Sequence, residues 1–535
     1  MDRSFARADR SAVRRAAPLA LLLAVAAAWR AFQWSRTVSM FNDGPLFLDI
    51  ARAIAAGDGD AVLGQPHHPL YSLLVAAVHG LGVDWETAGA AVSIAGGTAA
   101  VGLAFWLLRD LFGEAPAWLG ASLLAVHARA VEYSSDVQTD GIYLACFLAA
   151  AWWLWRAWSR RSLGFAAAAG LASGLAYLAR PEGVALVGVA GLLASASWLR
   201  DRWPAGFALR WLGTFAIAAA LCAAPYVIAL QHHAGSWSLT HKKSVAALLG
   251  AASAIPAQRP AASPAPAAPA PARAPALAAP PAAQPGGRLD RGEDGLAVVR
   301  ADSGAARSAA SAKMLARTAK SAFRYGPLAL LAMGLVAARG RPTRRAWWIA
   351  SLLAVYGALL YALTFQMGYV SRRHALPPLV PLFGYVGLGA IAMGAAIARV
   401  ARRGPALASA LAIALVALVA AGEIATQREP RRAEERAARA AAEWLREHAE
   451  PAPLAVSRLR LGYYAGMPYI RLTRVDDASF QSFLEQSGAR YLLLDDPADV
   501  EAARRVAGDQ LRPLHRAHEG GRDAWVFERV GWAAP

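Results

Sequence analysis

The residues best suited to chemistry stand in one stretch of a chain that is otherwise mostly apolar. Residues 41–74 read FNDGPLFLDIARAIAAGDGDAVLGQPHHPLYSLL and follow the first long apolar segment. Because carboxylates such as Asp43 and Asp49 cross a bilayer only at high cost, we expect this stretch at a membrane surface. An aspartate, with an ordinary pKa of about 3.9, is ionised at neutral pH and can take a proton from a reacting hydroxyl or amine.

Ionisable residues recur where later apolar runs end on the same expected side of the membrane. Together with the first stretch they form this set: Asp43, Asp49, Glu132, Asp136, Asp140, Arg180, Glu182, His232, His233, Arg372, Arg373 and His374. Few charges fall in the middle of a run, which favours a cavity near one membrane face over an ion pathway. Carboxylates with arginines suit a substrate that has a reacting hydroxyl or amine and a phosphate leaving group, since the guanidinium can bind the phosphate.

The carboxylates also have simpler interpretations. Asp43, which precedes Gly-Pro, could cap the surface helix that we expect over Pro45–Ala56. Asp49 could pair with Arg52 on that helix. Asp136 and Asp140 could bind the arginines or cap the span that follows them.

The arginines have alternatives of the same kind. Arg180, before Pro-Glu-Gly, could be a turn residue that pairs with Glu182. An arginine pair such as Arg372 and Arg373 usually marks the cytoplasmic side of a span. Here the pair falls on the opposite expected side, so a negative partner such as a donor phosphate is expected to compensate it.

The composition excludes an ordinary soluble protein. Of 535 residues, 56% are hydrophobic and 17% are charged, and the mean hydropathy is +0.31. These values and several long apolar runs indicate a polytopic membrane protein. The net charge of +18 is spread over short clusters between the runs. This distribution is typical of membrane topology and not of nucleic-acid binding.

Cysteine and histidine usage gives no firm cofactor. Cys146 and Cys222 lie inside apolar runs, so we expect neither a disulfide framework nor a metal cluster. The neighbours His67 and His68 could bind a divalent metal together with a carboxylate, although paired loop histidines are more often simply polar.

Hydropathy and arginine clusters predict about eleven spans, with a basic cytoplasmic N-terminus over residues 1–17. The predicted spans are 18–38, 87–108, 116–131, 139–155, 163–178, 184–199, 211–230, 323–338, 347–365, 376–397 and 406–421. Arginine clusters follow the inward spans, which supports the assignment.

The predicted domains follow from these spans. The membrane domain covers residues 18–422, with a first outer loop over 39–86 and a long outer loop over 231–322. The long loop includes an Ala/Pro-rich insert at 254–287, which we expect to be a disordered spacer. Residues 423–535 are expected to form a small outer α/β domain, with helices over 433–448 and 497–506 and strands over 454–457, 491–494 and 525–530.

Five short motifs resemble the GT-C superfamily of polytopic glycosyltransferases, in the branch of protein O-mannosyltransferases and bacterial aminoarabinose transferases. They are Asn42-Asp43-Gly44, His68-Pro69-Leu70-Tyr71, Ser135-Asp136 with Thr139-Asp140, Arg180-Pro181-Glu182-Gly183, and Ser371-Arg372-Arg373-His374-Ala375-Leu376-Pro377. Their order and shared sidedness, over most of residues 18–400, make the set more specific than any one motif.

The resemblance implies an inverting glycosyltransferase that takes a sugar from a polyprenyl-phosphate donor on the outer face of a bacterial inner membrane. Asp43 matches the position of the catalytic base, although Asp-Gly replaces the Asp-Glu of many members. Arg180, Arg372 and Arg373 are the candidates for holding the donor phosphate. Further candidates for substrate binding are Asp49, His67, His68, Tyr71, Asp136, Asp140, Glu182 and His374.

Two other functions stay open at this point. A transporter or flippase of lipid-linked sugars is the main alternative, but it would favour internal repeats and polar residues at mid-membrane. A binding module on a membrane anchor needs far fewer spans. The acceptor, whether lipid, glycan or protein, and the sugar itself are not readable from the residues.

Overall fold

The structure is a computed structural model that describes residues 3–235, 237, 239–240, 304–340, 343–472 and 477–532. The chain divides into two compact units. The first, which we call the helical unit, comprises the described residues up to Ser35, from Ile50 to Thr240 and from Gly304 to Arg428. The second, the sheet unit, comprises Arg36–Asp49 and the described residues that follow Arg428. The Ala/Pro-rich insert at 254–287 lies outside the described residues.

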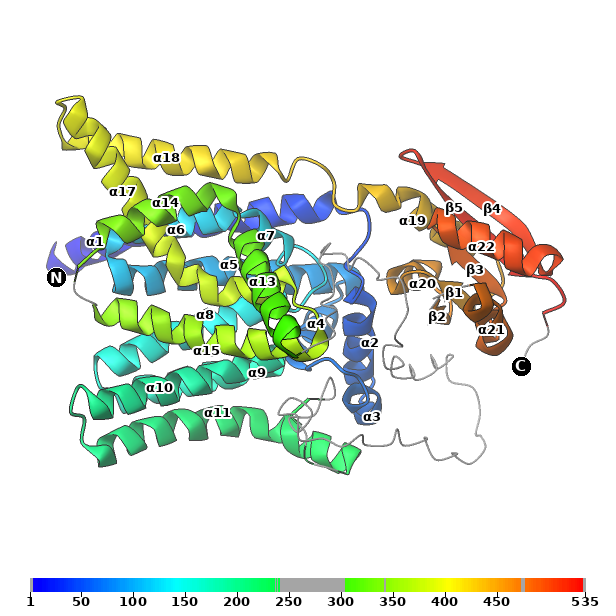
Figure 1. Cartoon of the computed structure of the whole chain (residues 1–535), viewed down its shortest axis with the longest axis horizontal. Helices are drawn as coiled ribbons and strands as arrows, with labels where there is room; N and C mark the ends of the chain where they lie inside the picture. Colours follow the sequence, from blue (N-terminus) through cyan, green and yellow to red (C-terminus); the bar gives the residue numbers. More distant parts are fainter. Residues whose placement is uncertain are drawn as a thin grey trace. The chain divides into compact units, whose positions relative to one another are not determined.

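The long helices of the helical unit run side by side in Figure 1. Its elements are α1 (Arg3–Ser35), α3 (Gly59–Leu63), α4 (Leu70–His79), α5 (Trp85–Phe112), α6 (Glu114–Val126), α7 (Ala128–Glu132), α8 (Asp140–Ser159), α9 (Leu163–Ala179), η1 (Pro181–Val184), α10 (Ala185–Leu199), α11 (Ala205–Ala234), α13 (Gly304–Phe323), α14 (Tyr325–Ala337), α15 (Arg344–Met367), α16 (Arg372–Leu379), η2 (Val380–Leu382), α17 (Phe383–Val400) and α18 (Pro405–Ala425). Helix α2 (Gly44–Ala55) begins in the sheet unit and ends in the helical unit.

Each of the eleven predicted spans overlaps one of these helices. Within the described residues, seven helical segments are long and apolar enough to cross a membrane: those of α1, α5, η1–α10, α11, α15, α16–α17 and α18. Helices α4, α6, α9 and α14 are apolar but shorter. The chain is therefore a multi-pass membrane protein, as predicted, while the count of eleven and the sidedness stay predictions.

Glycines allow the helices to approach one another closely. In lipid, helix association depends on packing more than on apolar burial, so small residues at crossings are favoured. A Cβ atom added to Gly334 of α14 would lie 1.8 Å from the Tyr385 carbonyl oxygen of α17. A Cβ atom added to Gly97 of α5 would lie 2.3 Å from Ser134 Oγ, just before α8. These contacts fix how close the neighbouring elements lie.

The two ends of the helical unit differ in chemistry. At one end, α5 finishes and α8 finishes, and Arg156 Nε donates to Asp110 Oδ2 at 2.6 Å. We call this the arginine end. At the other end, α6 and α9 finish and α8 begins, which brings Asp140 and Arg180 to the same end. We call this the site end.

The sheet unit is a five-stranded mixed sheet with helices. Its elements are η3 (Ala433–Glu435), α19 (Arg436–His448), β1 (Leu454–Val456), α20 (Leu459–Ala465), β2 (Tyr469–Arg471), α21 (Asp477–Ser487), β3 (Tyr491–Leu494), α22 (Pro497–Ala507), η4 (Gly508–Gln510), β4 (Leu511–Glu519) and β5 (Arg522–Arg529). The strand order is β2-β1-β3-β5-β4. Strand β1 pairs in parallel with β2 and β3, and β5 pairs antiparallel with β3 and β4. The predicted α/β character of this part is confirmed.

A buried ion pair network ties the sheet unit together. Glu435 is 2% exposed and accepts hydrogen bonds from Arg460 Nε at 2.7 Å and from Ser39 Oγ at 2.6 Å. Arg458 also pairs with this carboxylate. Burial by itself raises the pKa of Glu435. The two arginines and Ser39 lower the pKa by more than burial raises it, so the pKa lies below its ordinary value. The carboxylate is therefore held in its charged form.

Candidate functional site

Arg180 occupies the centre of the site end because its backbone cannot continue α9. The residue before a proline is disfavoured in the helical region, and Arg180 is extended, with φ −153° and ψ 138°. Its N–H still donates to the Ala176 carbonyl, and Pro181 then starts the short helix η1. This turn directs the Arg180 side chain into the bundle, where it is 7% exposed.

Two carboxylates neutralise Arg180. Its Nη1 pairs with Asp140 Oδ1, and its Nε and Nη2 each lie 3.4 Å from an oxygen of Glu182. Asp140 and Glu182 are themselves only 6% and 9% exposed. A buried charge is tolerated when it is paired, and removal of one partner is costly. The turn pairing of Arg180 with Glu182, one of the simpler interpretations of the sequence, is therefore present together with a second partner.

His374 joins the same network from α16. Its Nδ1 accepts the Ser371 N–H at 3.3 Å, as part of a capping box at the start of the helix. In a neutral imidazole the proton then resides on Nε2. This atom lies 3.5 Å from Glu182 Oε1. The site therefore links the start of α8, the end of α9 and the start of α16.

A small pocket opens beside this network. Its lining residues are Ala130, Tyr133, Ser134, Asp140, Tyr143, Leu144, Arg373, Leu376 and Pro377. Asp140 Oδ2 is buried and has no hydrogen-bond partner among the described residues. The pocket thus presents a carboxylate oxygen able to accept a hydrogen bond, and an arginine able to bind an anion.

Two tyrosines that the sequence analysis did not single out complete the site. Tyr143 of α8 and Tyr356 of α15 are buried, and their hydroxyl oxygens lie 2.7 Å apart. The Arg180 guanidinium lies 5.5 Å from the centre of the Tyr143 ring. Tyr143 follows Asp140 by three residues, which places the two on one side of α8. That spacing is the one signal that could have marked it.

Other predicted residues serve neighbouring contacts. His68 Nδ1 lies 2.7 Å from the Tyr177 carbonyl oxygen, one turn before Arg180. The Tyr71 hydroxyl donates to the Gly89 carbonyl of α5 at 2.8 Å. Asp136 is fully buried, and its Oδ1 accepts the Val137 N–H at 2.7 Å.

The remaining predicted residues lie apart in sequence and element. His67 is also buried. Arg372 is the first residue of α16, next to Arg373. Asp43 and Asp49 belong to the sheet unit, where Tyr469 Oη donates to Asp49 Oδ2 at 3.4 Å. That Asp43 meets the arginines of the helical unit stays a prediction.

A metal centre is not formed by the described part of the chain. No three His, Cys, Asp or Glu side chains there lie close enough together to hold one ion.

Comparison with protein families gives one match. Residues 65–228 match the family described as Dolichyl-phosphate-mannose-protein mannosyltransferase, PMT_2. This range contains the histidine, aspartate and Arg-Pro-Glu-Gly motifs of the sequence. Comparison with curated proteins gives no match.

Solved structures share the fold along nearly the whole chain. ArnT from Cupriavidus metallidurans bound to undecaprenyl phosphate is 13% identical with a TM-score of 0.57, over 96% of this chain and 99% of that one. The apo oligosaccharyltransferase from Archaeoglobus fulgidus is 12% identical with a TM-score of 0.54, over 97% and 74%. The Archaeoglobus fulgidus oligosaccharyltransferase AglB in complex with an inhibitory peptide and a dolichol-phosphate has a TM-score of 0.50 at 12% identity, over 97% and 75%. At these identities the likeness concerns the fold.

The chain thus combines a multi-pass helical fold, shared with ArnT and the archaeal oligosaccharyltransferase, with a segment that matches a mannosyltransferase family, as the motifs predict. The match to the PMT_2 family covers residues 65–228 and agrees with the branch that the sequence motifs resemble.

Proposed function

We propose that this protein transfers a sugar from a polyprenyl-phosphate donor to an acceptor at the site end, with inversion at the anomeric carbon. The observation that carries the proposal is the pocket in which Arg373 and the unpartnered Oδ2 of Asp140 line one small space. An anionic phosphate needs a cation such as Arg373, and a sugar hydroxyl or amine needs a hydrogen-bond acceptor such as the Asp140 carboxylate.

The donor class is supported by the family and by the structural relatives. The matched family is described by a dolichyl-phosphate-linked sugar, and two relatives were solved with undecaprenyl phosphate and dolichol-phosphate. The lipids named in the family description and in the two structures are all polyprenyl phosphates. An anionic headgroup at the end of a long apolar chain suits a pocket that includes an arginine at one end of an apolar helix bundle.

The arginines take different roles in this proposal. Arg180 already has two carboxylates within its reach, so we assign to it the ordering of Asp140. Arg373 lines the pocket, with Arg372 beside it, and is assigned to the departing phosphate. Asp43 is assigned as general base for the acceptor, as the resemblance implies.

The site faces outward from the cytoplasm in this proposal, in a bacterial inner membrane, because the arginine clusters favour a cytoplasmic arginine end. The acceptor is a lipid, a glycan or a protein. A peptide is bound in one relative of the same fold, AglB.

The test is a reconstitution that separates transfer from movement. Purified protein in lipid vesicles receives isotope-labelled polyprenyl-phosphate sugars extracted from bacterial membranes, and membrane and peptidic acceptor fractions are added. Mass spectrometry is expected to find released polyprenyl phosphate together with labelled sugar bonded to an acceptor. Donor that crosses the bilayer unchanged, with no new covalent product, would instead support the flippase.

A further inference from the structure

Helix α7 connects α6 to the wall of the pocket. It has five residues, Ala128–Glu132, and the next residues, Tyr133 and Ser134, line the pocket. A helix this short is not stable through its own hydrogen bonds. The contacts that hold α7 therefore decide where this wall lies.

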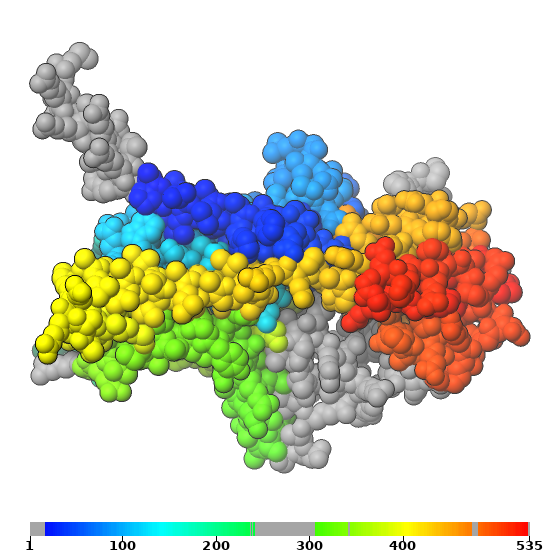
Figure 2. Space-filling view, turned by 90° about the horizontal axis from the view of Figure 1, so that it is seen from above, coloured from blue at the N-terminus to red at the C-terminus, as the bar shows by residue number. Residues whose placement is uncertain are grey.

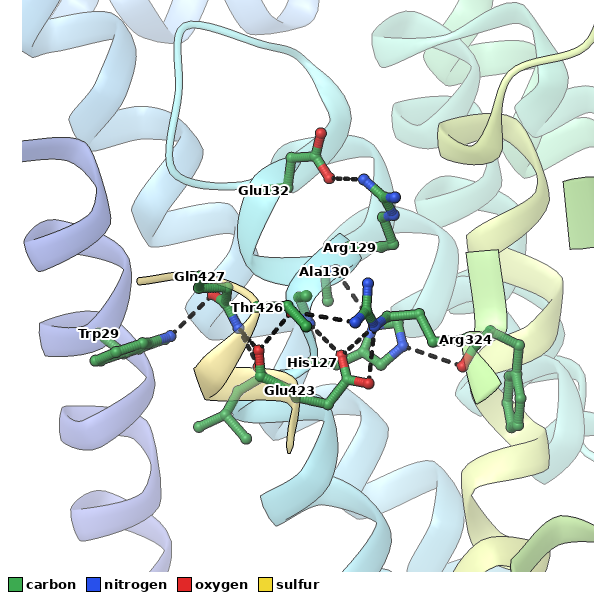
Figure 3. Close-up of polar contacts among 12 residues, drawn as sticks. Trp29, His127, Arg129, Ala130, Glu132, Arg324, Glu423, Thr426 and Gln427 are labelled. Carbon is green, nitrogen blue, oxygen red and sulfur yellow. Dashed lines mark hydrogen bonds and ion pairs between the residues drawn. The ribbon is translucent and has the colours of Figure 1, made fainter. Parts of the chain in front are cut away.

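Glu423, near the end of α18, holds the beginning of α7. The side chain is 3% exposed, its Oε2 accepts the Ala128 N–H at 2.9 Å, and its Oε1 accepts Arg324 Nε at 2.8 Å. Figure 3 shows Glu423 directed toward Arg324 and toward the corner at His127. Figure 2 shows α18 along the surface of the helical unit, and Glu423 is one of its three buried residues, with Ala412 and Val416.

Gln427 adds a second link to the same corner, four residues after Glu423. Its Nε2 donates to the Val126 carbonyl at 2.8 Å, where α6 ends. Its Oε1 accepts the Trp29 indole N–H of α1 at 3.1 Å, as Figure 3 shows. The corner between α6 and α7 is thus bound to both α18 and α1.

Arg30 of α1 reaches the pocket wall directly. It is 1% exposed, its Nε donates to Ser134 Oγ at 2.8 Å, and its Nη1 donates to the Ala125 carbonyl at 3.0 Å. The absence of a side chain at Gly97 makes room, since a Cβ atom there would lie 2.7 Å from Arg30 Nε. One guanidinium therefore spans from the end of α6 to a residue of the pocket.

We infer that Glu423 and Arg30 form a clamp that positions the pocket wall from Tyr133 to Asp140 for the transfer reaction. Both act as positioning residues, because their contacts are with α6, α7, Arg324 and Ser134. Ionised groups within an apolar bundle are costly, and charge-assisted hydrogen bonds in low dielectric are strong and directional. The inference rests on the proposed function for its kinetic consequence but not for its structural one.

The kinetic test compares clamp variants with a matched ion pair elsewhere. Glu423→Gln and Arg30→Gln are purified, reconstituted in vesicles and assayed for sugar transfer per folded molecule. We expect kcat to fall roughly tenfold to a hundredfold, the scale of a small misplacement of reacting groups. The affinity for undecaprenyl phosphate is expected to stay at the wild-type value, because Arg373 lies on α16. Arg30→Lys keeps the charge without the fork and should retain an intermediate kcat.

The matched control is Asp110→Asn at the arginine end. This substitution removes the carboxylate that pairs with Arg156, where Arg156 Nε lies 2.6 Å from Asp110 Oδ2. The pair is at the opposite end of the helical unit from α7. A general loss of structure would affect the control and the clamp variants alike, whereas a clamp lowers kcat in Glu423→Gln and Arg30→Gln alone. Wild-type kcat in folded clamp variants would overturn the inference.

Hydrogen–deuterium exchange tests the clamp without any catalysis. Peptides from residues 127–140 should exchange faster in Glu423→Gln than in wild type, and peptides from α5 should not. Unchanged exchange over 127–140 would overturn the inference. If wild-type protein transfers no sugar, the proposed function fails, and the exchange result still supports or overturns the clamp.

Discussion

Arg180 is buried and Arg373 is partly buried, and the two arginines stand in different surroundings. The charge of Arg180 is matched by Asp140 and Glu182, so a further anion at its guanidinium would face two carboxylates. Arg373 lines the pocket together with Asp140 of this network. We therefore assign the donor phosphate to Arg373, and to Arg180 the orientation of Asp140.

Asp43 provides the sharpest prediction for a single residue. Asp43→Asn keeps the shape of the side chain but cannot take a proton from the acceptor. We expect the transfer rate to fall by roughly a hundredfold to ten-thousandfold, the usual contribution of a general base. The measurement is the vesicle assay, at equal amounts of folded protein.

The control for this prediction is Asp60→Asn. The Asp60 side chain is 92% exposed and is not a candidate for the site. Its variant should transfer at the wild-type rate. If Asp43→Asn transferred as fast as Asp60→Asn, the base would have to be another residue.

The motifs predicted part of the site and missed its aromatic part. Asp140, Arg180, Glu182 and His374 lie in one network, because each stands where a helix begins or ends at the same end of the bundle. Tyr143 and Tyr356 lie within apolar runs, where a tyrosine is usually interpreted as a core residue, so the motifs did not include them. Their contact joins positions 213 residues apart, and the sequence contains no signal for that pairing.

The crossing of α14 and α17 decides how the helical unit packs. At Gly334, even a methyl group would overlap the Tyr385 carbonyl of the facing helix. A backbone atom cannot move aside as a side chain can, so the helices would have to separate. Overpacking of this kind costs about 1–3 kcal/mol or more.

Gly334→Ala is therefore expected to lower the free energy of unfolding by at least about 1 kcal/mol. Thermal unfolding in detergent measures the change. Gly357→Ala in α15 is the matched control, because a Cβ atom there meets nothing within 4 Å. Equal unfolding temperatures for the two variants would contradict the close crossing.

At the scale of elements, hydropathy predicted the helices well and the sheet unevenly. Long apolar runs have few alternatives to helices in a membrane, so each predicted span overlaps a helix. The short apolar strand β3 was predicted with its observed bounds, whereas β2 and β4 were not predicted. Strand β4 reads LRPLHRAHE, and its many charged and polar residues hide the alternation of a strand.

The whole molecule combines two units that rely on different interactions. The helical unit depends on close helix contacts, whereas the sheet unit has a buried charge cluster at Glu435. The pKa of Glu435 is lower in the folded protein than its ordinary value of 4.5. The stabilisation from this carboxylate is therefore fully present above about pH 4.5 and is lost as the pH falls toward the lowered pKa.

The stability of the sheet unit should consequently depend more strongly on pH in wild type than in the Glu435→Gln variant. At pH 7 that variant should lose about 3 kcal/mol of stability, because Arg460 and Arg458 lose their buried partner. Between pH 5 and 3, roughly the range of carboxyl titration, its stability should change less with pH than that of wild type. Denaturant unfolding followed by Trp fluorescence across this range measures both effects.

Glu443→Gln on α19 is the control for this prediction. Its carboxylate is 37% exposed and pairs with Arg439 four residues earlier, so its loss should cost less than about 1 kcal/mol. A Glu435→Gln protein with the same dependence on pH as wild type would show that this carboxylate does not stabilise the sheet unit in its charged form.

The most direct test of the account is the binding of undecaprenyl phosphate to the whole protein in nanodiscs. Wild type, Arg373→Gln and Arg403→Gln are titrated, the last losing an exposed arginine between α17 and α18. Loss of a charge-assisted contact should weaken binding to Arg373→Gln by roughly tenfold to a hundredfold and leave Arg403→Gln unchanged. Equal affinity of wild type and Arg373→Gln would contradict the assignment of this pocket to the donor phosphate.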